Sequence, residues 1–177
     1  LQPNALWQGR QSAKAGQFVR LRLEIEGRRV ERLYSLSSRP GARLIAITVK
    51  RQTGGLVSEF LHEQVKVGDV LTLSQPAGDF VLPDPLPGKI LLLSAGSGIT
   101  PVMAMLRHLQ AREYSGDVVF LHVCRNPQAL IFAKALRAIE ETFAELSLLV
   151  HFDDTDGPFT PEVLQYAVPD WDERSTW

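Results

Sequence analysis

The sequence predicts two parts of different fold class: an antiparallel β-barrel of the α+β type, followed by a parallel sheet in a three-layer α/β unit. Three observations predict this. The first half holds short runs of alternating apolar and polar residues between glycine and proline turns. The second half alternates continuous apolar runs with helical patterns. Between them, residues 82–88 form a stiff, proline-rich connector, so we place the domains at residues 1–87 and 88–177.

Four strands are expected in the first part. Residues 18–25 alternate between apolar and polar side chains, which is typical of a strand with one buried face. The polar residues 26–29 include a glycine and predict a hairpin that leads into a returning strand at 30–36. Two further β-rich runs follow at 43–50 and 70–74. Short strands with tight turns indicate an antiparallel barrel or sandwich.

Strands and helices alternate in the second part. We expect strands at 90–94, 118–123 and 146–150, and helices at 102–112 and 130–143. This alternation produces parallel βαβ units with right-handed crossovers, in which ligands bind beyond the carboxyl ends of the strands. A further helix is expected after Thr160, which can cap it, and a further strand is expected from Thr176.

The composition excludes several classes of protein. The 177 residues carry a formal net charge of −1, which gives no electrostatic reason to expect nucleic acid or an anionic membrane as a partner. No apolar run approaches the ~20 residues of a membrane-spanning helix. Cys124 is the single cysteine and the four histidines are scattered, so neither a disulfide framework nor a metal site is predicted. No signal peptide and no initiator Met are visible, so we expect a cytoplasmic location and a chain that begins within a longer protein.

A glycine turn at residues 95–101 is the strongest candidate for a ligand site. It joins an apolar strand to a helix, an arrangement that presents free backbone N–H groups to an anion. Gly96 and Gly98 leave room for a phosphate, Thr100 can cap the helix, and Pro101 suits its first turn. The third glycine of the usual dinucleotide fingerprint is absent, and no Walker A lysine follows. On this pattern alone, a purely structural turn is an equally good interpretation.

Two places in the first half also offer groups that bind anions. Arg32 and Tyr34 share one face of a strand, where a cation and an aromatic ring can hold a phosphate and stack on a planar ring. The alternative is a solvated arginine beside a surface tyrosine. The pair Gly54–Gly55 opens a short helix, with Lys50 and Arg51 just upstream. The alternative there is a plain turn from loop to helix.

Four motifs together resemble the ferredoxin–NADP⁺ reductase superfamily in order and in spacing. They are Arg32-x-Tyr34-Ser35, Gly54-Gly55-x-Val57-Ser58, Pro76-Ala77-Gly78-Asp79-Phe80 and Ala95-Gly96-Ser97-Gly98-Ile99-Thr100-Pro101. The sequence is most similar to bacterial reductases in which a flavin domain and a pyridine-nucleotide domain precede a plant-type iron–sulphur domain. Electron-transfer partners of fatty-acyl desaturases are among these reductases.

The resemblance implies a set of residues that bind FAD. Arg32 would pair with the flavin pyrophosphate, Tyr34 would pack on the isoalloxazine ring, and Ser35 would lie near its N5 atom. The residues that would wrap the pyrophosphate, and so favour FAD over FMN, are Gly54, Gly55, Val57 and Ser58.

The resemblance also implies how NAD(P)H would bind. Gly96, Gly98 and Thr100 would take the pyrophosphate and nicotinamide portion. Arg125 follows the second strand of the α/β unit, where an arginine can hold the 2′-phosphate of NADPH, although NADH stays an alternative. Ser35 and Thr100 are the candidate catalytic residues, because they would position groups and donate hydrogen bonds. No residue is predicted to bind a metal.

The function implied is a reductase that passes a hydride from NAD(P)H to FAD and then single electrons to an iron–sulphur centre or ferredoxin, in the service of a desaturase or oxygenase. Two alternatives stay open: a reductase of free flavin or ferric iron, and a non-catalytic nucleotide-binding subunit.

The sequence departs from the family pattern at both ends. The family places two further strands before the segment at 15–18, and it has a Cys-Gly-x-Pro motif after a run similar to residues 170–177. We therefore expect a barrel that is incomplete at its N-terminus, a nucleotide domain that stops before its last strand, and a 2Fe–2S cluster outside this sequence.

Overall fold

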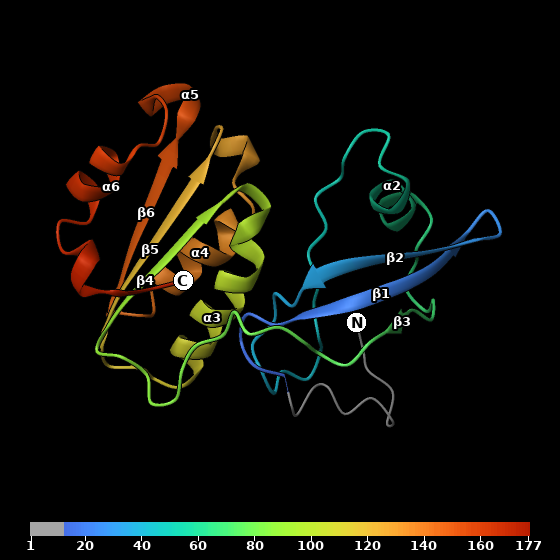
Figure 1. The fold of residues 1–177 in the computed structure, drawn as a ribbon, viewed down its shortest axis with the longest axis horizontal. Helices are drawn as coiled ribbons and strands as arrows, with labels where there is room; N and C mark the ends of the chain where they lie inside the picture. The colour runs from blue at the N-terminus through green and yellow to red at the C-terminus, as the bar shows by residue number, and fades with distance from the viewer. Residues whose placement is uncertain (1–12) are drawn as a thin grey trace.

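The computed structural model describes residues 13–177. It contains an antiparallel unit (residues 13–81) and a parallel unit (residues 89–177), which lie next to each other in Figure 1. Residues 82–88 connect them without regular secondary structure. The expectations for the start of the chain lie outside the described residues.

The antiparallel unit is built on a three-stranded sheet in the order β2-β1-β3. Its strands are β1 (Phe18–Ile25), β2 (Arg28–Ser35) and β3 (Thr72–Leu73). The predicted hairpin is confirmed, because β1 pairs with β2 along its whole length around a tight turn at Glu26 and Gly27. Both turn residues have positive φ, at 51° and 72°, as the twist of a two-residue hairpin requires.

The strand expected at 43–50 is wrong. Within residues 13–177, this run makes an isolated bridge between Leu36 and Ile47 and no continuous ladder. Ile45 still packs in the core of this unit with Val19 and Leu36. The run is therefore an extended loop, and its apolar residues serve to pack against the core of this unit. The strand expected at 70–74 is shorter than predicted, and helix α2 (Leu56–Glu63) lies between the two runs.

The parallel unit has the predicted βαβ topology. Its four-stranded sheet has the order β6-β5-β4-β7, and each pair is parallel. The strands are β4 (Lys89–Ala95), β5 (Asp117–Cys124), β6 (Leu146–Phe152) and β7 (Ser175–Thr176). β7 confirms the strand expected from Thr176.

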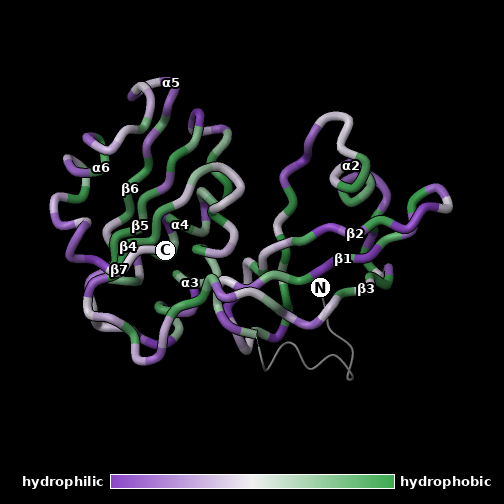
Figure 2. Tube along the Cα trace, in the orientation of Figure 1, coloured by the Kyte–Doolittle hydropathy of each residue, from purple (hydrophilic) through white to green (hydrophobic). Residues whose placement is uncertain are grey.

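Helices cover both faces of this sheet, which confirms the three layers. α3 (Ile99–Ala111) and α4 (Ala133–Glu140) pack with Ile90, Leu92 and Phe120 on one face. α6 (Pro161–Ala167) packs on the other face, against the strand residues with alternate numbers. Figure 2 shows the resulting hydrophobic colour along β4 and β5.

Short helical turns complete the parallel unit. The 3₁₀ turns are η1 (Gly96–Gly98), η2 (Pro127–Ala129) and η3 (Trp171–Glu173), and α5 (Asp153–Asp156) is a single turn after β6. Thr160 caps α6 as predicted, since its Oγ1 accepts a hydrogen bond from the amide of Val163 at 3.4 Å.

The two units are packed against each other through α3. Ala15 is 5% exposed and belongs to the same core cluster as α3. A Cβ atom at Gly16 would overlap the carbonyl oxygen of Phe80 and lie 2.5 Å from Cε of Met105. A hydrogen bond also joins the two units, because Trp177 donates from Nε1 to the carbonyl of Val81 at 2.9 Å. Within residues 13–177, no helix has the length and apolar character needed to cross a membrane.

Candidate dinucleotide site

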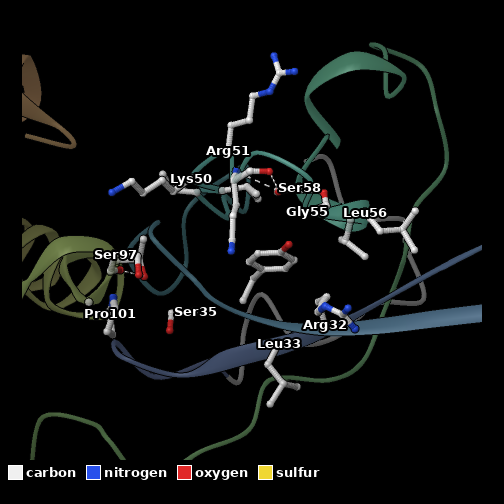
Figure 3. Close-up of a pocket in the computed structure, with 17 residues that line it drawn as sticks. Arg32, Leu33, Ser35, Lys50, Arg51, Gly55, Leu56, Ser58, Ser97 and Pro101 are labelled. Atoms are coloured by element: carbon white, nitrogen blue, oxygen red, sulfur yellow. Dashed lines mark hydrogen bonds between the residues drawn. The ribbon is translucent and has the colours of Figure 1, made fainter. Parts of the chain in front are cut away.

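A pocket of about 800 Å³ is formed jointly by the two units. Its lining comes from the end of β2, from residues 48–58 before and within α2, and from the turn at 97–101 (Figure 3). Three of the four motifs that carry the family resemblance therefore meet in one place, although they are far apart in the sequence.

The end of β2 supplies a cation, an aromatic ring and a hydroxyl. Arg32 is exposed, and its Nη1 donates to the carbonyl of Glu31 at 2.8 Å. Tyr34 is partly buried, and burial raises the pKa of its phenol although the charge of Arg32 opposes this. Strand alternation places Tyr34 and Ser35 on opposite faces. Both nevertheless line the pocket, which extends around the end of β2.

The segment before α2 adds positive charge. Lys50 and Arg51 both line the pocket, and Figure 3 shows them above the end of β2. Arg51 also forms an ion pair with Glu63. The sequence drew attention to these two cations only as neighbours of Gly54 and Gly55. The hydrogen-bonding side chains Thr48 and Gln52, which also line the pocket, were missed because they carry no distinctive pattern.

Gly54 and Gly55 shape the turn more than they line the pocket. Gly54 has a φ of 73°, lies outside the pocket lining, and donates its amide to Oε1 of Glu59 at 2.9 Å. At Gly55, a Cβ would lie 2.6 Å from Oγ of Ser58. Gly55, Val57 and Ser58 do line the pocket.

The turn after β4 forms the opposite wall. Gly96 has a φ of 52°, which favours glycine, but it lies outside the pocket lining. Ser97, Gly98, Thr100 and Pro101 do line the pocket. The expectation that Thr100 caps α3 is wrong, because Gly98 is the N-cap residue and Oγ1 of Thr100 donates to the carbonyl of Ser97 at 3.1 Å.

The fold alone does not require a glycine at position 98, whereas a ligand that approaches the backbone would. The φ of Gly98 is −61°, which any residue adopts, and a Cβ there would meet no other heavy atom of the described residues within 4 Å. Neither backbone strain nor packing therefore explains the glycine. Gly98 lines the pocket, and the absence of a Cβ lets a ligand approach its backbone closely.

A buried polar pair lies on the carboxyl halves of β4 and β5. Ser94 Oγ is 2.8 Å from Nδ1 of His122, and the His122 side chain is fully buried. Burial lowers the pKa of His122 to about 4, although the bond to Ser94 opposes this, so the ring is neutral at pH 7. Its Nε2 has no hydrogen-bond partner among the described residues.

Arg125 is not brought to the pocket. Its side chain is 80% exposed, and its Nε lies 3.7 Å from Oδ1 of Asp154. A second hollow of about 500 Å³, lined by Ala95, Val123 and Asp153 among others, lies at the carboxyl ends of β4 and β5. No group of three or more His, Cys, Asp or Glu within residues 13–177 could hold a metal ion.

A glycine turn at the switch from strand to helix, opposite a wall of cations and a tyrosine, is an arrangement suited to binding a dinucleotide. The sequence matches the oxidoreductase FAD-binding domain family over residues 9–82 and the oxidoreductase NAD-binding domain family over residues 92–165. The chain therefore belongs to the ferredoxin–NADP⁺ reductase-like oxidoreductases, with an FAD-binding domain followed by a NAD-binding domain.

Individual relatives agree with this assignment. An NADPH oxidoreductase of Mycobacterium tuberculosis is 41% identical over 166 residues, which are 92% of this chain and 44% of that protein. A glycine betaine monooxygenase reductase subunit of Chromohalobacter salexigens is 37% identical over 172 residues, which are 91% and 47% of the two chains. The chain thus spans about half the length of these relatives.

A solved structure gives the same fold. The ferredoxin–NADP⁺ reductase of Neisseria gonorrhoeae, crystallised with FAD and NADP, superposes with a TM-score of 0.71 at 26% identity. The match covers 92% of this chain and 69% of that one.

Proposed function

We propose that this chain is the FAD- and nicotinamide-binding part of a reductase that takes electrons from NAD(P)H and delivers them to an iron–sulphur acceptor. The observation that carries the proposal is the shared pocket, in which Tyr34 and Ser35 of one unit and Gly98 and Thr100 of the other line the same space. When bound there, FAD supplies the redox chemistry by accepting a hydride from NAD(P)H and releasing the electrons singly.

The antiparallel unit holds the flavin in this proposal. Tyr34 offers a ring face for the isoalloxazine, Ser35 offers a hydroxyl near its reactive edge, and Arg32 neutralises the pyrophosphate. Lys50 and Arg51 add positive charge to the same pocket. Gly54, Gly55, Val57 and Ser58 form the turn at the start of α2 that accommodates the pyrophosphate.

The parallel unit holds the nicotinamide nucleotide. Gly96 gives the turn its positive φ, Gly98 leaves open space beside the pocket, and Thr100 fixes the turn through its bond to Ser97. No side chain of the pocket needs to act as an acid or base, because the protein contributes orientation and the cofactors contribute the reactive groups.

NADPH is the nucleotide that we propose as donor, on the strength of Arg125. Its ion pair with Asp154 is exposed, and exposed pairs contribute only ~0–1 kcal/mol, so a 2′-phosphate could replace the carboxylate. Arg125→Gln should raise KM for NADPH about tenfold and leave KM for NADH unchanged, as expected for one lost charge-assisted contact. Equal changes in the KM values for NADPH and NADH would show that Arg125 does not bind the 2′-phosphate.

The acceptor that we propose is a 2Fe–2S centre, on a ferredoxin or on a further domain, that serves an oxygenase or desaturase. A relative named as a monooxygenase reductase subunit supports the oxygenase more than the desaturase.

The test is to incubate the chain with FAD, remove free flavin by gel filtration, and measure NADPH oxidation with ferricyanide and with a 2Fe–2S ferredoxin. We expect FAD to stay bound and oxidation to depend on it. Oxidation that requires added free flavin would instead indicate a free-flavin reductase. Nucleotide binding without oxidation would indicate a non-catalytic subunit.

A further inference from the structure

One charged side chain connects the two walls of the pocket. Arg107 lies on α3 two helical turns after Thr100, and therefore on the same side of the helix. Its Nη1 donates a hydrogen bond to the carbonyl oxygen of Ser37, at a distance of 2.5 Å. This bond joins the helix that follows the glycine turn to the segment that follows Ser35.

Ser37 is firmly held within the antiparallel unit. It is 1% exposed, and its Oγ lies 2.9 Å from Oγ1 of Thr48 and 3.2 Å from the carbonyl oxygen of Ala46. Its amide donates to the same carbonyl at 2.8 Å. Ser35 and Thr48 both line the pocket. Ser37 is therefore linked to two residues of the pocket wall, to Thr48 through its hydroxyl and to Ser35 along the chain.

Arg107 is also held on its other side. Its guanidinium carbon lies 5.2 Å from the centre of the Phe132 ring, within the range of a cation–π contact. Phe132 has a φ of 65°, a left-handed conformation that is uncommon outside glycine, and its side chain packs against the core beneath α3. Burial lowers the pKa of Arg107, but an arginine stays charged at any working pH.

We propose that Arg107 is a positioning residue, which sets the separation between the pocket wall at Ser35 and the turn at Gly98 by holding the Ser37 carbonyl. The inference rests on the proposed function, because this separation fixes the distance between the two bound rings. Hydride transfer needs reacting atoms ~3–3.5 Å apart, and a displacement of ~1 Å can reduce a rate ~100-fold. Arg107 itself lies outside the lining of the pocket.

The kinetic test compares three variants. Arg107→Met keeps a long side chain without donor or charge, Arg107→Lys keeps the charge, and Arg112→Met is the matched control, since Arg112 is exposed at the end of α3. Anaerobic stopped-flow should show the limiting rate of flavin reduction at least tenfold lower in Arg107→Met, with both ligand Kd values within twofold of the native chain. The charge-transfer absorbance of the nucleotide complex should fall in parallel, and Arg107→Lys should recover part of both signals.

A purely structural role gives a different result. Arg107→Met would then lose thermal stability and FAD content, but its FAD-loaded molecules would react within twofold of the native rate, and this result would overturn the proposal. If Arg107→Met does not fold, Arg107→Lys takes its place, with a loss of at least threefold in limiting rate expected and an unchanged rate contradicting the proposal.

Hydrogen exchange of the ligand-free chain gives a readout that does not depend on activity. Amides of residues 35–48 should exchange faster in the Arg107 variants and at the native rate in Arg112→Met. Unchanged exchange in all variants would also overturn the proposal. If the native chain does not reduce FAD with either nucleotide, the proposed function is wrong. The exchange rates would still show whether Arg107 holds Ser37 in place.

Discussion

Arg32 lines the pocket from an exposed position on β2, and its guanidinium donates a hydrogen bond to the carbonyl of the neighbouring Glu31. Arg32→Gln should weaken FAD binding about tenfold, since a hydrogen bond to a charged group contributes ~1.5–3 kcal/mol and solvent reduces this value at an exposed site. Flavin fluorescence titration measures the Kd. The control is Arg28→Gln, on the same face of β2 but outside the pocket lining, which should bind FAD normally. Equal effects of both variants would indicate general electrostatics.

His122 makes stability depend on pH. Its pKa is lowered to about 4 in the fold from 6.5, so the unfolded chain binds more protons between these values. Stability from this group is therefore fully present above pH 6.5 and is lost as the pH falls toward 4. We expect the free energy of unfolding to fall by about 2 kcal/mol more between pH 7 and pH 5 in the native chain than in His122→Gln. Urea unfolding at the two pH values measures this, and identical losses in both proteins would contradict the account.

At the scale of elements, the turn between β4 and α3 tests whether Gly98 is needed for the fold or for binding a nucleotide. Gly98→Ala should leave the melting temperature within about 2 °C, because the backbone accepts alanine and the Cβ meets no neighbour within 4 Å in the part of the chain that the structure describes. It should weaken NADPH binding by tenfold or more, if the nucleotide approaches this backbone closely. Equilibrium titration of the FAD-loaded chain gives the Kd. Gly88→Ala is the control, because its Cβ also meets no atom of residues 13–177 within 4 Å. Unchanged affinity would show that this turn is only structural.

Elements with strong periodicity were predictable from the sequence, whereas the absence of a strand at residues 43–50 was not. The hairpin of β1 and β2 and the alternation of β4, α3, β5, α4 and β6 follow from local patterns. Residues 43–50 have the composition of a strand, but a strand also needs a partner, and local sequence does not contain that information. α5 was missed because one helical turn is too short to show a period.

The candidate site was predictable as separate pieces. Glycines and an arginine at motif spacing identified three segments that line the pocket, but only tertiary structure shows that they enclose one space. It also shows that Gly54 and Gly96 shape turns, and that Thr100 bonds to Ser97 instead of capping α3. Arg107 carried no signal in the sequence, since an arginine inside an amphipathic helix is usually solvated.

At the scale of the whole molecule, Gly16 lies where the antiparallel unit meets α3 of the parallel unit. Its φ is 101°, and a Cβ would overlap the carbonyl oxygen of Phe80 and lie 2.5 Å from Cε of Met105 on α3. Gly16→Ala should cost more than ~2 kcal/mol in the free energy of unfolding, with a loss of FAD retention. Gly27→Ala is the control, because Gly27 has a positive φ of 72° but open space around it, so only the backbone cost of ~1 kcal/mol should appear. Chemical denaturation measures both losses. Similar losses in the free energy of unfolding for the two variants would mean that the atoms around Gly16 move aside to accommodate a Cβ.

The central claim is that one pocket brings a flavin and a nicotinamide nucleotide together. The most direct measurement is the visible absorption spectrum of the FAD-loaded chain before and after anaerobic addition of NADPH and, separately, NADH. The account predicts that the flavin band bleaches with the nucleotide, and faster with NADPH. A flavin band that neither nucleotide bleaches would contradict it.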